Sequence, residues 1–207
     1  MSRIRANTIT NKAATGAPTF SNGAVVTGVC TATSFKKPDG TAVGGKTLQV
    51  VQGTKADSFN TTSASDVEVT GLNVAITPIA ASSKVLLNIH LGSVGGQTNC
   101  YAGFTLYRIN PDSSSSDLLI GTGGTSNRPN VTFSVNTNAQ SDYHTNPASF
   151  QFLDTPTYSV GQTITYKVKV RSGYNNKNIW VNRQHNQDDQ NYSFHTASTY
   201  IAQEIGA

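Results

Sequence analysis

The most regular hydrophobic pattern in the chain is TITYKVKVR, residues 163–171, where Ile, Tyr and Val alternate with Thr, Lys and Arg. An alternation with a period of two is typical of an antiparallel strand with one face in a core. The segment KVLLNIHLG, residues 84–92, has the same pattern and places Asn88 and His90 on its polar face. Both segments are therefore predicted to be half-buried strands.

Short apolar runs bounded by turn residues continue along the rest of the chain after residue 46. Many short strands at short intervals favour a sandwich or a jelly roll. No segment has the apolar spacing that predicts a helix longer than one or two turns. We therefore predict an all-β fold with an antiparallel β-sandwich (jelly-roll) head over residues 44–207. The other expected strands are TLQVVQ (47–52), DVEVTG (66–71), YAGFTLYRI (101–109), DLLIGT (117–122), NVTFSV (130–135), SFQFLD (149–154), NIWVN (178–182) and STYIAQEI (198–205).

Residues 1–43 differ from the head in their sequence pattern, because short apolar runs are separated by Asn, Gly and Thr. We predict an extended, strand-like stem that ends in a glycine-rich hinge, KKPDGTAVGGK (36–46). Isolated strands are unstable without partners, but three copies wound around one axis would bury their apolar side chains together. A disordered tether is the alternative. The candidates for the stem and trimer core are Phe20, Val25, Val26, Val29 and Phe35.

Composition narrows the classes of function. Of the 207 residues 36% are hydrophobic and 13% are charged, and the net charge of +4 comes from scattered Lys and Arg. Nucleic-acid binding requires clustered basic residues, so it is not expected. No apolar run is long enough to span a membrane, and the absence of a signal-peptide core predicts synthesis in the cytoplasm. Cys30 and Cys100 are expected to be free thiols.

Two motifs could carry chemistry. GTAVGGKT (40–47) matches the phosphate-loop expression, but that loop must open a helix, and a strand pattern follows it here; no cofactor is expected. RQHNQDDQNYSFH (183–195) gathers His185, Asp188 and Asp189. Metal sites require several ligands that converge on one point, so we interpret this segment as a solvated loop. No metal site, no catalytic residue and no enzymatic activity are predicted.

A ligand site is the remaining hypothesis for the loops near the C-terminus. Aromatic rings flanked by amide side chains suit sugars, because the rings stack on C–H faces while the amides pair with hydroxyl groups. The alternative for the single tryptophan is that it points into the core. The candidate ligand contacts are Tyr174, Asn176, Trp180, Arg183, His185 and Tyr192.

The chain resembles the tail-fibre-like virion structural proteins of tailed phages that infect cyanobacteria. The N-terminal residues 3–35 look like the stem of those proteins, and six segments of the head carry the rest of the resemblance. These are GGKTLQVVQ (44–52), ITPIAASSKVLL (76–87), FTLYR (104–108), FLDTPTYSVGQTITYKVKV (152–170), IWVNR (179–183) and STYIAQEIGA (198–207).

The resemblance implies a homotrimer with a jelly-roll head akin to the tumour-necrosis-factor and complement globular heads. It implies a virion protein that contacts other virion proteins through residues 1–43 and presents its head for host attachment, with host-surface polysaccharide as a candidate ligand. It carries over no catalytic residue, and Gln203 departs from the apolar residue expected there. The apolar side chains of Tyr101, Phe104 and Tyr107 also favour a trimer, because together they exceed what one face of a small sandwich needs for its core.

Two other functions stay open. A capsid decoration or head-fibre protein would use the same architecture to cap or stabilise the shell. A polysaccharide-degrading spike enzyme would need a pair of carboxylates on the β scaffold, and the chain has only eleven Asp and Glu residues.

Overall fold

The structure is a computed structural model that describes residues 25, 27–28, 47–137, 142–174 and 176–206. In this part of the chain there are strands, turns and loops but no helix, so the predicted all-β fold is confirmed. The strands are β1 (Thr47–Lys55), β2 (Phe59–Thr61), β3 (Val67–Ile76), β4 (Lys84–Gly96), β5 (Tyr101–Ile109), β6 (Ser115–Leu118), β7 (Phe133–Asn136), β8 (Thr145–Asp154), β9 (Ile164–Ser172), β10 (Ile179–Val181) and β11 (Ser198–Ile205).

The chain divides into two units between Val43 and Gly44. Of the predicted stem core, Phe20, Val26, Val29 and Phe35 lie outside the described residues, whereas Val25 is described and is exposed in the single chain. The predicted stem and the division into stem and head therefore stay predictions.

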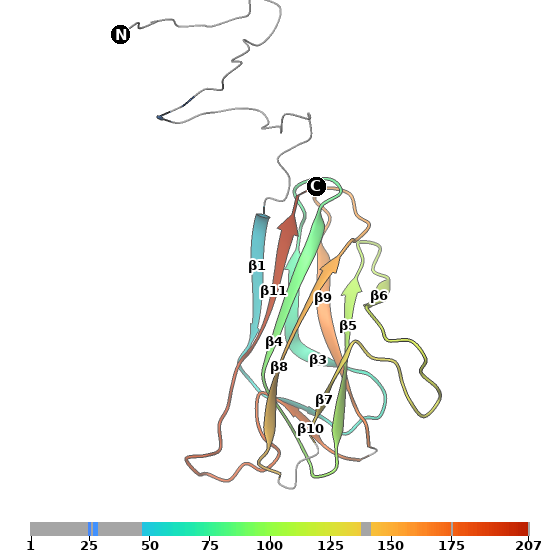
Figure 1. Ribbon diagram of the computed structural model, residues 1–207, viewed down its shortest axis with the longest axis vertical. Coiled ribbons are helices and arrows are strands. Elements are labelled where there is room, and N and C mark those ends of the chain that lie inside the picture. Colours follow the sequence, from blue (N-terminus) through green and yellow to red (C-terminus); the bar gives the residue numbers. More distant parts are fainter. Residues whose placement is uncertain (1–24, 26, 29–46, 138–141, 175, 207) are drawn as a thin grey trace, which may run out of the picture. The chain divides into compact units, whose positions relative to one another are not determined.

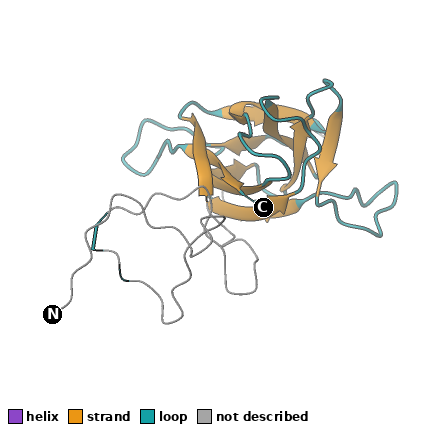
Figure 2. Ribbon diagram, turned by 90° about the horizontal axis from the view of Figure 1, so that it is seen from above, coloured by secondary structure: helices purple, strands orange, loops and turns teal. Residues whose placement is uncertain are grey.

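The strands of the second unit form two antiparallel sheets that face each other (Figure 2). In the first sheet β4 is central: β11 and β10 pair with one of its edges and β8 with the other, while β1 pairs with β11 and β2 with β10. In the second sheet the order is β3-β9-β5, and β6 and β7 both pair with β5. From β3 onward the chain crosses repeatedly between the layers, since β3, β5 to β7 and β9 lie in the second sheet and β4, β8, β10 and β11 in the first, as in a jelly roll.

The strand register gives the sandwich two distinct ends (Figure 1). At the proximal end, Thr47 at the start of β1 lies opposite Ile205 at the end of β11. At the distal end, Gly96 at the end of β4 lies opposite Ile179 at the start of β10. The connections β4–β5, β9–β10 and β10–β11 are all at the distal end, so the chain enters and leaves the sandwich at the other one.

Alternating apolar side chains fill the space between the sheets, as the pattern of residues 84–92 and 163–171 predicts. The rings of Phe104 and Phe133 stack at 5.0 Å between centroids, and those of Phe133 and Phe150 at 5.3 Å. This stack joins β5 and β7 of one sheet to β8 of the other. Each fully buried aliphatic or aromatic side chain contributes about 1.5–3 kcal/mol to folding, so the alternation stabilises both layers.

One buried ion pair interrupts this apolar core near the proximal end. The guanidinium of Arg108 donates through Nη1 to both carboxylate oxygens of Asp154 at 2.7 Å, and the hydroxyl of Tyr166 donates to the same carboxylate at 2.9 Å. The side chain of Asp154 is 6% exposed. Because a buried carboxylate without partners is costly, these donors are what allow Asp154 to lie between the sheets.

Several strands differ from the predicted ones, and β3, β4 and β8 are longer than predicted. Of the segment 117–122 only the first two residues belong to β6, because Leu119 adopts a left-handed backbone conformation (φ 47°) that ends the strand. In the segment 130–135 the strand begins later, at Phe133. The short strand β2 was not predicted, since its three residues are too few to show an alternation.

Candidate functional site

The side chain of Trp180 projects outward from the first sheet near the distal end. It is the middle residue of β10, and its neighbours Ile179 and Val181 are fully buried in the core. The alternation of a strand therefore places the indole on the outer face, where it is half-buried. The alternative that Trp180 points into the core is wrong.

Arg183 and His185 hold the indole of Trp180 in place. The guanidinium carbon of Arg183 lies 3.5 Å from the centroid of the Trp180 rings, which is a cation–π contact. The indole Nε1–H donates to Nδ1 of His185 at 3.1 Å, so His185 in its neutral form carries its proton on Nε2. Three of the six candidate ligand contacts thus form one cluster, and a guanidinium occupies one face of the indole.

Gly95 of β4 allows the loop with these side chains to pack against the sheet. A Cβ at position 95 would lie 2.6 Å from the carbonyl oxygen of Arg183 and 2.7 Å from Cα of Gln184. Only glycine permits this approach of two backbones. Residues 183–184 therefore fold back over the outer face of β4. They lie next to Trp180, because Trp180 of β10 pairs with Gly95 of β4.

Asp142 extends the cluster from a different segment of the chain. Its Oδ2 lies 3.9 Å from Nε2 of His185, and its Oδ1 accepts hydrogen bonds from the backbone N–H and the hydroxyl of Thr98 at 2.8 and 2.9 Å. Burial alone would raise the pKa of the Asp142 carboxyl, but the hydrogen bonds from the Thr98 backbone N–H and hydroxyl outweigh it and lower the pKa. The carboxylate is thus ionised at neutral pH and faces the imidazole.

The remaining candidates lie at the same end of the sandwich but outside this cluster. Tyr192 packs against the edge of Tyr143, with 5.5 Å between ring centroids and 79° between planes, and the Tyr143 hydroxyl donates to Asp188. Tyr174 and Asn176 are exposed in the β9–β10 loop. Tyr143 and Asp142 were not predicted to belong here, because nothing in the sequence relates them to a loop some forty residues later.

The acidic residues of this loop do not converge on His185. Asp188 pairs with Tyr143, whereas the carboxylate near His185 belongs to Asp142. Within the described residues no group of three or more His, Cys, Asp and Glu side chains could hold a metal ion. The described residues also form no helix with the length and hydrophobicity that a membrane crossing requires.

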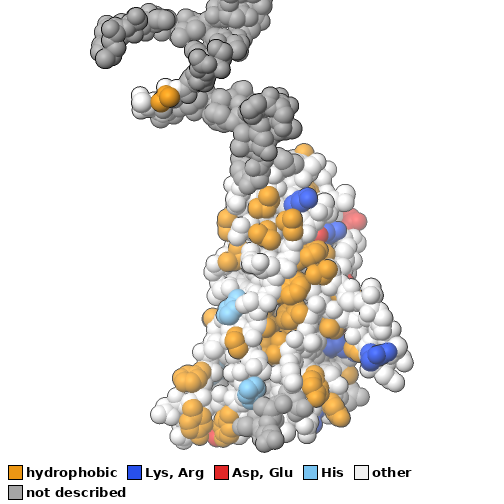
Figure 3. Space-filling view, in the orientation of Figure 1, with side chains coloured by type: hydrophobic (Ala, Val, Ile, Leu, Met, Phe, Trp, Pro, Cys, Tyr) orange, Lys and Arg blue, Asp and Glu red, His pale blue; other side chains and the backbone are white. Residues whose placement is uncertain are grey.

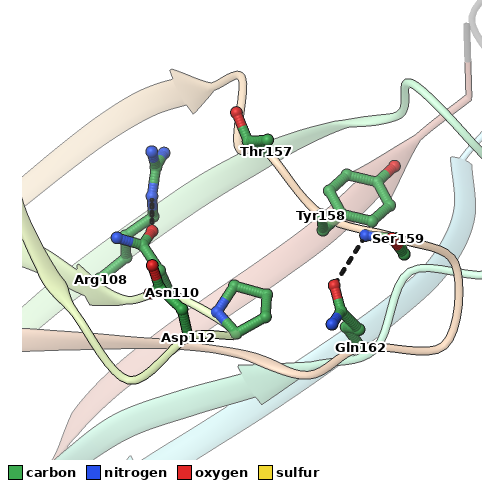
Figure 4. Close-up of a pocket in the computed structure, with 8 residues that line it drawn as sticks. Arg108, Asn110, Asp112, Thr157, Tyr158, Ser159 and Gln162 are labelled. Carbon is green, nitrogen blue, oxygen red and sulfur yellow. Dashed lines mark hydrogen bonds between the residues drawn. The ribbon is translucent and has the colours of Figure 1, made fainter.

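A concave site of about 470 Å³ lies at the proximal end, between the loops that follow β5 and β8 (Figure 4). Arg108 faces it, but Nε of this guanidinium donates to Asn110 at 2.6 Å and Nη1 is bound to Asp154. Across the hollow, the backbone N–H of Ser159 donates to Gln162 at 2.8 Å. The guanidinium of Arg108 and the side-chain amide oxygens of Asn110 and Gln162 are thus engaged in bonds within the protein, so we assign this hollow a structural role.

The structure corrects the sequence argument for a trimer. Phe104 is fully buried and belongs to the stacked core. Tyr107 is 5% exposed, since Nζ of Lys169 lies 4.4 Å over its ring and its hydroxyl donates to Glu68. Of the three residues only Tyr101 is exposed, so their number does not indicate a contact with another copy.

Sequence comparisons and structure comparisons with known proteins give different results. No protein-family model matches the chain, and no curated protein sequence matches it. Among solved structures, that of the infectious bursal disease virus Gx strain is similar with a TM-score of 0.37 and 16% sequence identity. The match covers 78% of this chain and 37% of that one, so this chain spans little more than a third of its length.

Proposed function

We propose that this protein is a structural appendage of a phage virion, of the tail-fibre-like type that its sequence resembles. In this proposal the protein is a homotrimer, residues 1–43 bind other virion proteins, and the β-sandwich head contacts the host surface. The proposal includes no enzymatic activity, cofactor or nucleic-acid partner.

The observation that carries the proposal is the placement of the chain ends and the candidate loops at opposite ends of the head. The chain enters the sandwich at Thr47 and leaves it after Ile205, both at the proximal end. The loops with the candidate ligand contacts lie at the other end (Figure 1). A head that is attached at one end and carries its binding loops at the other is suited to adhesion, since loops on a rigid scaffold commonly carry binding residues.

The distal loops offer aromatic rings to a ligand. Tyr174 is 56% exposed and Tyr192 is 50% exposed, whereas one face of Trp180 is covered by Arg183. Exposed phenol rings in loops that also carry the exposed residues Asn176 and Gln187 fit a polysaccharide, whose C–H faces stack on rings and whose hydroxyls pair with amides. We therefore expect Tyr174 and Tyr192 to contribute more to binding than Trp180.

Binding of the labelled full-length chain to host cells tests adhesion. We expect saturable binding that soluble host polysaccharide competes away and that Tyr174→Ala with Tyr192→Ala weakens at least about tenfold, since stacked aromatic groups are frequent binding hot spots. Val160→Ala, which alters an exposed apolar residue near the proximal end, is the matched control. Unchanged binding of the double variant would show that these two tyrosines of the distal loops do not contribute to host binding.

The same assay separates the open alternatives. A spike enzyme would shorten the host polysaccharide during the incubation, and a shell-capping protein would not bind the cells. Intact polysaccharide together with saturable binding is the result that the adhesion proposal predicts.

A further inference from the structure

The imidazole of His185 lies between two partners in the distal cluster. On one side, the indole Nε1–H of Trp180 donates to its Nδ1 at 3.1 Å. On the other side, Oδ2 of Asp142 lies 3.9 Å from its Nε2, which is too long for a hydrogen bond. The side chain of His185 is 19% exposed, so water reaches the ring. In the neutral ring Nδ1 is therefore the acceptor and Nε2 the donor.

A second proton on this ring is incompatible with the hydrogen bond to Trp180. In an imidazolium both nitrogens carry a hydrogen, and neither can accept. The indole Nε1–H can only donate, so two N–H groups would face each other across 3.1 Å. The imidazolium and the indole must therefore separate whenever His185 binds a proton.

The carboxylate of Asp142 can bind the protonated ring. Although burial would raise the pKa of the Asp142 carboxyl, the hydrogen bonds from Thr98 lower it, so this group stays ionised over the pH range in which histidines ordinarily titrate. The separation of 3.9 Å leaves room for an imidazolium to approach and to form a charge-assisted hydrogen bond. Proton binding thus exchanges the bond between His185 and Trp180 for an ion pair with Asp142.

Two cations oppose this exchange. The guanidinium carbon of Arg183 lies 3.5 Å from the centroid of the Trp180 rings, and its Nη2 donates to the backbone oxygen of His185 at 3.2 Å. Its positive charge is therefore close to that of an imidazolium. Lys177 of the β9–β10 loop interacts with Asp142 through its charge. Asp142 favours the imidazolium, whereas Arg183 and Lys177 disfavour it.

The other titratable groups of the neighbouring loops are bound elsewhere or exposed. Asp188 accepts from the hydroxyl of Tyr143, and the imidazole of His195 is bonded to Gln187. At the distal end of the face drawn in Figure 3, hydrophobic and histidine side chains lie on the surface and charged ones are sparse. The few charges around His185 therefore decide its state. The exposed titratable residues next to these are His144 and Asp189.

The position of His185 is connected to that of Tyr192 in the same loop. Arg183 holds the backbone oxygen of His185 through Nη2. Next to it, Nε2 of Gln184 donates to Oγ of Ser193 at 3.1 Å. Because Ser193 follows Tyr192 directly, a movement of residues 183–185 is transmitted to that exposed ring.

We infer that His185 is a pH-dependent switch in the distal loops. When it is neutral it holds the indole of Trp180, and when it is protonated it releases the indole and pairs with Asp142. The switch is a property of the free chain and does not depend on the proposed function. In the proposed function it also makes the contact of Tyr192 with the host surface depend on pH.

A pH titration of the full-length chain without any ligand tests the inference through Trp180, the only tryptophan. Its fluorescence and its indole N–H resonance in NMR spectra are followed from pH 8 to pH 5, the interval in which the charge of a histidine ordinarily changes. We expect a red shift, faster quenching by acrylamide and a displaced resonance as the pH falls, because the released Nε1–H is then hydrated. Circular dichroism checks that the sandwich stays folded.

Three variants assign the transition to a residue. His185→Gln keeps an acceptor for the indole but cannot be protonated, so the transition should disappear. Asp142→Asn keeps an oxygen that can accept from Thr98 but removes the charge, so the midpoint should move to lower pH. His195→Gln lies in the same loop and is the matched control, which should titrate as the wild type does.

Three results would overturn the inference. The first is a wild type whose fluorescence and indole resonance do not change between pH 8 and pH 5. The others are a transition that persists in folded His185→Gln and one that disappears in His195→Gln instead. If His185→Gln does not fold, NMR of the wild-type ring nitrogens decides: Nδ1 of His185 has to gain its proton over the same pH range in which the indole resonance moves.

Discussion

At the scale of single residues, two fully buried tyrosines differ in the partners of their hydroxyl groups. The hydroxyl of Tyr166 donates to Asp154 at 2.9 Å, whereas that of Tyr200 has no hydrogen-bond partner among the described residues. Burial, together with the nearby Asp154 charge, raises the pKa of both phenols, so both stay protonated. A buried polar group without a partner does not stabilise the fold.

Replacement of each tyrosine by phenylalanine should therefore give different results. Tyr166→Phe removes a hydrogen bond to a charged group and should lower the free energy of unfolding by about 1.5–3 kcal/mol. Tyr200→Phe should leave it unchanged or raise it slightly. Urea denaturation measures both, and an equal loss in the two variants would contradict the assignment of the hydrogen bond.

Two aspartates in ion pairs differ in burial, and the same substitution compares them. Asp154→Asn leaves Arg108 without its charge partner between the sheets, which should cost about 3 kcal/mol. Asp117 pairs with Lys169 on the surface, where its side chain is 45% exposed, so Asp117→Asn should cost less than about 1 kcal/mol. Equal losses in denaturation experiments would show that the buried pair does not stabilise the sandwich as described.

The carboxylate of Glu204 gives the head a pH dependence. Burial would raise the pKa of this group, but hydrogen bonds from the Gln49 amide at 2.6 Å and from the backbone N–H groups of Ile79 and Ala80 at 3.1 Å lower it below its ordinary value of 4.5. A lowered pKa in the folded state means that the contribution of Glu204 to stability is complete above about pH 5 and is lost as the pH falls through that lowered pKa.

Glu204→Gln measures this contribution, because an amide cannot accept all of these bonds. The variant should be about 1–3 kcal/mol less stable than the wild type at pH 7. The difference should shrink as the pH falls below 4.5, since the wild-type carboxylate then becomes protonated. A difference that stays constant between pH 7 and pH 3 would show that protonation of Glu204 is not responsible.

At the scale of the element, Gly95 couples β4 to the loop with Arg183 and His185. Gly95→Ala should push residues 183–184 away from the sheet, because the added Cβ would overlap their backbone atoms. Trp180 is the only tryptophan, so its fluorescence reports on this movement: we expect a red shift and faster quenching by acrylamide. Gly121→Ala, whose Cβ would meet its nearest atom at 3.5 Å, is the control. Identical spectra for both variants would contradict the close packing.

The strands could be predicted from the sequence where the alternation is long, as in β4 and β9, since a period of two identifies the buried face directly. Ile179, Trp180 and Val181 show the limit: three residues are too few to tell which side faces the core. The contact between His185 and Asp142 could not be predicted at all, because it depends on how loops from β4–β5, β7–β8 and β10–β11 meet at one end. The positions of these loops relative to one another are set by the strand register and not by the local sequence pattern.

At the scale of the whole molecule, the two ends of the head differ. Its proximal end receives the chain at Thr47, and its distal end carries the exposed rings of Tyr174 and Tyr192. In the proposed function this head is one part of a homotrimer, held at its proximal end and with its binding loops at the distal end. The central claim is that this head belongs to a virion appendage.

Electron cryotomography of intact phage particles with gold-labelled antibody against the distal loops tests this claim most directly. The account predicts gold at the outer tips of thin appendages, away from the particle body, and no gold on particles that lack the protein. Gold spread evenly over the capsid shell would favour a decoration protein instead. Purified particles that carry no gold, while the antibody binds the free chain, would contradict the claim that this protein is part of the virion.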